Sequence, residues 1–471
     1  YNKIQPLAGT GTYGHIVGGF ENKIKDESDW LNVIVGGLGN QIREITKPSG
    51  QTETSYACYN NFIGAGQYNY ITNSTYSFIG SGINNYITGT YRGTSEYNSI
   101  VGGVFNLIRV TNTGFTANDR NHYNSILGGT VNYITDGRVA NTIIGGSINE
   151  ISGSSYSTIG GGYRNKIKGP NNNENQDSNS VVGGRSNHLY GSSKHSIIAG
   201  GLTNYISDSD NSIIGSGKDN TISASTSSSV IGGENNFIAS DNSLSLVDTV
   251  RSIIGSGLEN KIYNTYNSLI GAGEKNQISG VLKGGYGSGG GGHNSIVSGY
   301  KNIITGSSTS NISSGSENSI SDSVGSSVIG GFSNIVGGAY YSFVGGINNN
   351  VNSSNNSFII GSGNTLTNSD YSSIIGGNDN LIRSLSYSNI SGSIIGGKNN
   401  LLIDAINSVI IGGENLTGTT SNTTYVPFLN INNLGTGTSV NNLGIDISGN
   451  VVTATTGAGA FTSTTLNNTI I

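Results

Sequence analysis

The chain has 471 residues and a formal net charge of −5, and only 10% of its residues are charged. Its 75 glycines and 34% hydrophobic content are poor for a compact globule but sufficient for an elongated repeat protein. The charge balance argues against a nucleic-acid partner, the single cysteine against a disulfide framework, and the lack of a long apolar run against membrane insertion.

One line of sequence recurs along most of the chain. It reads "NSIIGSGKDNTI" at 211–222 and "RSIIGSGLENKI" at 251–262. When the copies are aligned on their Asn, an Ile, Val or Phe stands six residues before it, a Gly three before it, and an Ile, Leu or Val two after it. The anchoring Asn residues run from Asn22 to Asn400, with a shortened copy around Asn364. Such self-similarity is the signature of a repeat architecture.

The spacing of the copies predicts the fold. The shortest intervals are 15 or 16 residues, as from Asn204 to Asn220, and the apolar pair Ile214 and Ile222 lies eight residues apart. Gly pairs and β-branched residues are poor helix formers, whereas Ile, Val and Thr bounded by Gly, Asn and Ser suit short strands. We therefore expect an all-β, parallel β-solenoid, or β-roll, with about 16 residues per coil. Roughly 21 coils at ~4.8 Å each would make a rod of ~100 Å.

The repeated Gly and Asn are expected to serve this scaffold. The glycines fit a tight bend or a close backbone approach. The Asn is predicted to hydrogen-bond the backbone of its own turn, or to form a ladder with the Asn of the next coil. A ligand-binding role for these residues is the weaker alternative, because a site does not usually repeat in every coil.

Some intervals are longer, reaching 29 residues from Asn40 to Asn69 and 26 from Asn106 to Asn132. Each excess follows the second apolar residue, so the insertions are predicted to leave from one edge of the rod. Aromatic and Arg side chains dominate the energy of many interfaces. The candidate receptor-binding residues near these insertions are Trp30, Tyr56, Tyr59, Arg120, His122 and Tyr123. The alternative is that the insertions are tolerated surface loops.

A second variable surface is predicted at the residue that follows each Asn, which should point away from the core. It is aromatic or polar in many copies: Lys23, Gln41, Tyr70, Tyr86, Tyr133, His188, Tyr205 and Phe237. Exposed tyrosines are typical of surfaces that contact carbohydrate or protein. Ordinary decoration of a strand surface is the equally weighted alternative.

Two stretches of the chain resemble known families. The "NSIIGSG" lines over 1–418 resemble the head repeats of trimeric autotransporter adhesins, which stack into a β-roll and pack as a trimer. From about Gly418 the repeat stops, and 419–471, including "TTYVPFLNINNLGTGTSVNNLGIDISGNVVTATTG", resembles segments of bacteriophage tail fibres. These resemblances imply a β-solenoid domain at 1–418, a β-rich C-terminal fibre segment at 419–471, and a homotrimer. Gly-rich lines also allow neighbouring chains to approach closely.

The residues give little support to catalysis. A glycan-cleaving tailspike needs two carboxylates roughly 5 to 9.5 Å apart, and carboxylates are sparse here. The histidines show no metal spacing, and the neutral Asn of the repeat cannot replace the carboxylates of a calcium-binding roll. We expect no enzyme, metal or cofactor, but a phage tail fibre of the virion that binds a host-surface glycan or protein and contacts other tail proteins. The alternatives are a glycan-degrading tailspike enzyme and a bacterial surface adhesin.

Overall fold

The computed structural model describes residues 1–6, 14–26, 31–43, 58–89, 95–109, 121–136, 139–169, 177–240, 249–280, 292–386, 391–428, 442–445 and 451–454. Throughout these residues the regular structure is β, and none of them forms a helix that could cross a membrane. The insertions that were expected to leave one edge of the rod lie largely outside the described residues.

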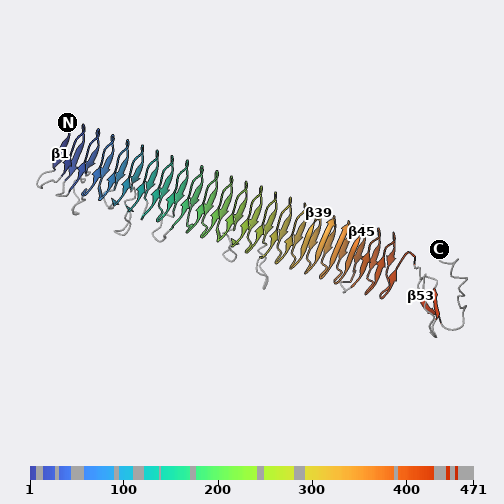
Figure 1. The fold of residues 1–471 in the computed structure, drawn as a ribbon. Helices are drawn as coiled ribbons and strands as arrows, with labels where there is room; N and C mark the ends of the chain where they lie inside the picture. Colours follow the sequence, from blue (N-terminus) through green and yellow to red (C-terminus); the bar gives the residue numbers. More distant parts are fainter. Residues whose placement is uncertain are drawn as a thin grey trace.

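The chain winds into a parallel β-solenoid of about 22 turns at a spacing of about 16 residues, which confirms the predicted repeat fold. The coils are stacked in chain order along one long axis (Figure 1). Each coil adds one short strand to each of two long parallel sheets, here called sheet A and sheet B. The coils stack in register because the same apolar positions recur at a nearly constant interval along the chain.

Sheet A has 23 strands. They are β1 (Lys3–Pro6), β3 (Lys23–Asp26), β5 (Gln41–Arg43), β7 (Tyr70–Thr72), β10 (Tyr86–Thr88), β13 (Leu107–Arg109), β16 (Tyr133–Thr135), β18 (Glu150–Ser152), β20 (Lys166–Lys168), β22 (His188–Tyr190), β24 (Tyr205–Ser207), β26 (Thr221–Ser223), β29 (Phe237–Ala239), β32 (Lys261–Tyr263), β34 (Gln277–Ser279), β36 (Ile303–Thr305), β38 (Ser319–Ser321), β40 (Ile335–Gly337), β42 (Asn350–Asn352), β44 (Thr365–Thr367), β46 (Leu381–Arg383), β48 (Leu401–Ile403) and β50 (Thr417–Gly418).

Sheet B precedes sheet A within each repeat line. Its strands are β2 (His15–Ile16), β4 (Val33–Ile34), β6 (Phe62–Ile63), β9 (Phe78–Ile79), β12 (Ser99–Ile100), β15 (Ser125–Ile126), β17 (Thr142–Ile143), β19 (Thr158–Ile159), β21 (Ser180–Val181), β23 (Ile197–Ile198), β25 (Ile213–Ile214), β28 (Ser229–Val230), β31 (Ile253–Ile254), β33 (Leu269–Ile270), β35 (Ser295–Ile296), β37 (Asn311–Ile312), β39 (Ser327–Phe332), β41 (Phe343–Ile347), β43 (Phe358–Ser362), β45 (Ser373–Asn378), β47 (Ser393–Ile395), β49 (Val409–Ile411) and β51 (Thr424–Tyr425).

The core contains the two apolar positions that the repeat predicts. Ile214 of sheet B and Ile222 of sheet A are both fully buried, and each stacks in register on the equivalent residue of the next coil. All these inward side chains belong to one continuous hydrophobic cluster that runs along the solenoid. One apolar residue per strand is therefore enough, because the coils above and below cover it.

The anchoring Asn residues form a buried ladder, and both predicted roles are confirmed. The Asn220 side-chain amide donates to the carbonyl oxygens of Ser216 in its own turn, at 3.1 Å, and of Gly233 in the next coil, at 3.0 Å. Its Oδ1 accepts the backbone N–H of Asn236 at 3.1 Å. The side chain thus satisfies buried backbone groups where the chain bends between the two sheets.

The Gly three residues before each Asn is required by this close packing. Gly217 has a φ of +97°, and a Cβ at that position would collide with the carbonyl oxygen of Gly233 in the next coil. A left-handed φ and a neighbouring backbone in contact leave room only for hydrogen.

Short strands outside the two sheets complete the described structure. β8 (Ser74–Thr75), β11 (Ser95–Glu96) and β14 (Asn121–His122) form a small parallel sheet, and β27 (Ser225–Thr226) pairs with β30 (Thr249–Val250). Beyond the solenoid, β52 (Asn442–Ile445) and β53 (Val451–Ala454) pair antiparallel.

Candidate functional site

Three of the six predicted receptor-binding residues lie in the described structure. Tyr59, His122 and Tyr123 stand close to the turn that leads into sheet B, in coils that follow the longest insertions. The other three predicted residues, Trp30, Tyr56 and Arg120, lie outside the described residues.

Tyr59 and Tyr123 belong to a column of four tyrosines, here called the tyrosine ladder, which also contains Tyr76 and Tyr97. Tyr59 meets Tyr76 edge to face, with ring centroids 5.4 Å apart. The Tyr76–Tyr97 and Tyr97–Tyr123 pairs are stacked nearly parallel, with centroids 4.7 and 5.0 Å apart. These distances match the spacing between coils, so one ring per coil makes a continuous stack.

The turn itself explains why these side chains project outward. Tyr76, Tyr97 and Tyr123 have φ values of 52°, 53° and 57°, in the left-handed region that is uncommon for a bulky residue. Each of their backbone N–H groups donates to a carbonyl of the preceding coil. Equivalent turns elsewhere hold Asn, Ser, His or Arg in the same conformation, so this backbone is a property of the coil. The side chain at the turn is free to vary.

Two phenols of the ladder have a raised pKa, which favours their neutral form. Desolvation and the neighbouring Tyr76 raise the pKa of Tyr97, and desolvation followed by Tyr76 raises the pKa of Tyr59. Beside the ladder, His122 Nδ1 lies 3.4 Å from Glu96 Oε2, and the His122 ring centroid lies 6.0 Å from that of Tyr123. The phenols therefore offer hydroxyl groups that both donate and accept hydrogen bonds.

The stacking limits how the ladder can bind. The faces of Tyr76 and Tyr97 are occupied by neighbouring rings, which leaves their edges and hydroxyls. Tyr123 ends the ladder, because Ala140 stands at the same turn of the next coil and contributes no ring. Tyr123 is also the most exposed member, at 57%. Its outer face is the place where a sugar ring or another flat apolar face could stack.

The second predicted surface is also present on sheet A. The residues that follow the anchoring Asn point outward and stack in register, as in the Tyr70–Tyr86 pair with centroids 5.0 Å apart. Further along, Tyr190 Oη lies 3.2 Å from His188 Nδ1, and burial followed by the Lys166 charge lowers the pKa of His188. These rings are half-buried against one another, so they offer less contact area than Tyr123.

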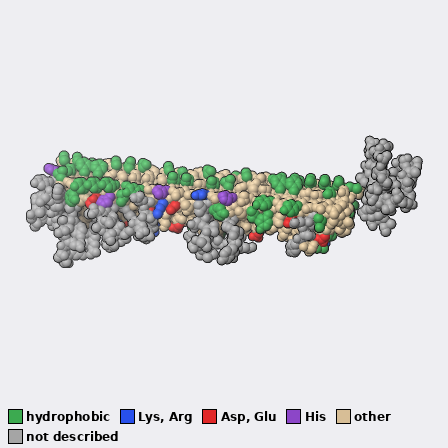
Figure 2. All heavy atoms as spheres, turned by 90° about the horizontal axis from the view of Figure 1, so that it is seen from below, with side chains coloured by type: hydrophobic (Ala, Val, Ile, Leu, Met, Phe, Trp, Pro, Cys, Tyr) green, Lys and Arg blue, Asp and Glu red, His purple; other side chains and the backbone are tan. Residues whose placement is uncertain are grey.

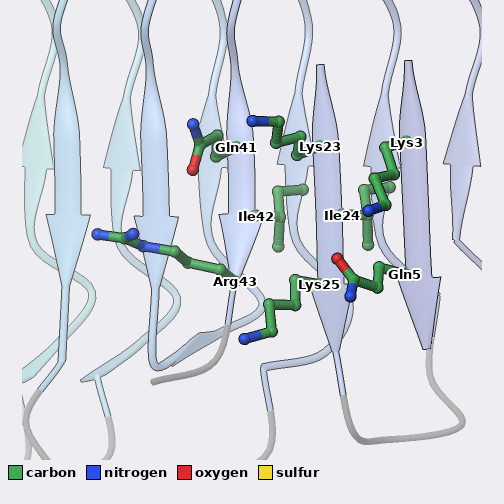
Figure 3. A pocket seen from close by; sticks show the side chains of 8 residues that line it. All are labelled: Lys3, Gln5, Lys23, Ile24, Lys25, Gln41, Ile42 and Arg43. Carbon is green, nitrogen blue, oxygen red and sulfur yellow. The ribbon is translucent and has the colours of Figure 1, made fainter. Parts of the chain in front are cut away.

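At the N-terminal end of sheet A, a shallow hollow of about 120 Å³ is lined by cationic side chains (Figure 3). Lys3, Lys23, Lys25 and Arg43 stand on neighbouring strands, with Ile24 and Ile42 between their rows. The chain continues into an acidic residue directly after Lys25 and after Arg43. We therefore do not assign the hollow as a separate anion site.

Several of the described carboxylates serve the scaffold. Asp208 and Asp210 each accept a backbone N–H from the preceding coil, at 3.0 and 2.9 Å. Others form ion pairs along the turns, such as Glu234 with Lys218 at 2.6 Å. Within the described ranges, no group of three or more His, Cys, Asp or Glu residues could hold a metal ion.

The sequence-based prediction missed Tyr76 and Tyr97. Their signal is a Tyr three residues before the buried Ile of sheet B, as in "TYSFI", "EYNSI" and "HYNSI". Alignment on the start of sheet B, in place of the insertions, brings these tyrosines into one column. Comparison with known protein families and with curated proteins finds no match for this chain.

Proposed function

We propose that the chain is a non-enzymatic adhesive fibre, a homotrimer that acts as a phage tail fibre and binds a glycan or protein on the host surface. In this role it would belong to the virion, with its attachment to other tail proteins made elsewhere along the fibre. The observation that carries the adhesive role is the tyrosine ladder with the open ring of Tyr123 at its end. A rigid scaffold that presents variable aromatic side chains suits recognition.

The regular solenoid supports a fibre more readily than an enzyme. In the described coils its buried polar positions are occupied by Asn, Ser and Thr, as where Asn204 and Ser196 accept backbone N–H groups of the next coil. One buried carboxylate is the exception: Asp177 Oδ2 accepts the backbone N–H of Ser155 at 3.3 Å. Carboxylates such as Glu234 lie at the surface in ion pairs with lysine. A glycan-degrading tailspike remains the competing proposal, and a bacterial surface adhesin is a second one with the same binding chemistry.

Truncation of the exposed ring tests the adhesive role. Tyr123→Ala is expected to weaken retention of the intact chain on its target among immobilised bacterial surface polysaccharides by at least about tenfold, because an exposed stacking face is lost. Binding would be followed by surface plasmon resonance across a panel of such polysaccharides.

Tyr371→Ala is the matched control. Tyr371 is 59% exposed and has a φ of 57°, so it resembles Tyr123 in exposure and backbone, but it lies in a distant coil. Retention of Tyr371→Ala should equal that of the unmodified chain. If Tyr123→Ala and Tyr371→Ala are both retained as well as the unmodified chain, the tyrosine ladder does not contact the receptor.

A further inference from the structure

The outward side of sheet B differs from the other surfaces of the solenoid. In nearly every one of its strands the inward residue is flanked by two residues that point outward, as Ile213 and Gly215 flank Ile214. We call these flanking positions the sheet-B face. In none of the described strands is either position Lys, Arg, Asp or Glu. Charged side chains stand at the turns on either side of the face, such as Arg251 before β31 and Lys218 after β25, which pairs with Glu234.

Large apolar side chains are exposed along the whole of this face. Ile231 is 62% exposed and Val182 is 56% exposed. Others above one-third exposure are Val17, Val35, Phe78, Val101, Leu127, Ile144, Ile197, Ile213, Ile253, Leu269, Val297, Ile329, Ile360, Ile375, Ile395 and Ile411. Hydrophobic side chains are seen aligned along the long axis of the solenoid in Figure 2. An apolar strip of this length on the solvent-exposed surface of a protein marks an interaction site.

The two flanking positions compensate each other in size. Where the first is large the second is usually small, as in the pairs Ile213–Gly215 and Ile253–Gly255. Where the first is small the second is usually large, as in Ser229–Ile231, although Thr158–Gly160 and Asn311–Ser313 lack a large residue. Most coils thus present one large apolar side chain beside a gap. Glycine at the second position also serves the coil itself, because a Cβ at Gly215 would lie 2.6 Å from the Ile231 carbonyl oxygen of the next coil. The resulting row of projections and gaps can interlock with an equivalent row on another surface.

The pattern also identifies the occupant. The partner must match the coil spacing of ~4.8 Å over about 22 turns, which a second copy of this chain does. The position of the large flanking residue differs between the two halves of the solenoid. In β12, β15 and β17 it follows the buried residue, whereas in β31 and β33 it precedes the buried residue. Only parallel copies at equal height bring every coil against its own equivalent.

We propose that the sheet-B face is the surface on which copies of this chain pack side by side, parallel and in register. This assignment rests on the proposed homotrimer and states which surface forms it. The uncharged strip becomes the apolar core of the assembly, and the ion pairs at the adjacent turn form part of its polar rim.

The test begins with the unmodified full chain, whose mass by light scattering should be three times the 48.6 kDa of one chain. The double variant Val182→Lys with Ile231→Lys places like charges at equal heights on every copy. It should reduce the mass to one chain while the circular dichroism spectrum stays unchanged. The control, Ile303→Lys with Ile335→Lys, alters exposed residues on sheet A and should leave the mass unchanged.

The outcomes separate this inference from the proposed function. A single-chain mass for the unmodified protein would overturn the homotrimer itself. A triple mass that persists in the sheet-B double variant would leave the homotrimer standing and overturn the interface.

Cysteine cross-linking covers the case in which the double variant fails to fold. The buried Cys58 is first replaced by Ser. Ser74 occupies the equivalent place in the next coil, so the scaffold accepts serine there. Under mild oxidation Ile231→Cys should then cross-link to its own equivalent in another copy. When chains with Val17→Cys are assembled together with chains with Ile411→Cys, no cross-link between the two kinds of chain should form. Cross-linking between the two ends would overturn the parallel arrangement.

Discussion

Replacing Ile254 by Asp is expected to lower the free energy of unfolding by roughly 4 kcal/mol or more. Ile254 is fully buried in the middle of the rod, between Val230 and Ile270 of the adjacent coils. The substitution removes apolar contacts and places a carboxylate among apolar side chains. Because each coil contacts only its neighbours, the stack should open first at this coil. Urea unfolding at fixed chain concentration, with hydrogen exchange by coil, measures both effects.

Ile303→Asp is the control for this prediction. Ile303 points outward on sheet A and is 39% exposed, so the same change of residue should cost less than about 1 kcal/mol there. Equal unfolding midpoints for Ile254→Asp and the unmodified chain would show that the inward position is wrongly assigned.

Asn220→Asp is expected to destabilise the chain by about 3 to 5 kcal/mol at pH 7. The carboxylate keeps an acceptor for the Asn236 N–H, but it can no longer donate to the carbonyls of Ser216 and Gly233. Burial should raise the pKa of this carboxyl above its unfolded value of about 3.9. The folded state then favours the protonated acid, so the deficit should shrink as pH falls from 7 towards 5.

Thermal unfolding of the variant and the unmodified chain at both pH values checks this expectation. Asn235→Asp serves as the control, since Asn235 lies one residue earlier on the exposed turn, where its φ of 54° suits Asp equally well. A deficit that stays the same at the two pH values would contradict the ladder chemistry, as would equal melting of the two variants.

The sequence alone predicts the period, the parallel solenoid and the inward residues, because each coil repeats the same hydrophobic pair. Ile214 and Ile222 could be assigned without coordinates, and the Asn ladder followed from a neutral side chain that recurs at a bend. These features depend only on neighbouring coils, which a repeat specifies many times over.

The tyrosine ladder and the sheet-B face could not be read in the same way. Tyr76, Tyr97 and Tyr123 are separated by insertions of unequal length. Alignment on the start of sheet B places them in one column, but only the structure shows that their rings stack. A single exposed residue such as Ile231 is ordinary in a strand. The apolar strip emerges only when some twenty such strands are stacked.

Incubation of the unmodified chain with the polysaccharide panel tests the adhesive fibre most directly, provided that bound chain and new reducing ends are measured in the same samples. We predict firm retention of the chain on at least one bacterial surface polysaccharide, with no increase in reducing ends. New reducing ends would establish the tailspike enzyme in its place. An absence of retention on the panel and on intact bacterial cells would contradict the adhesive role.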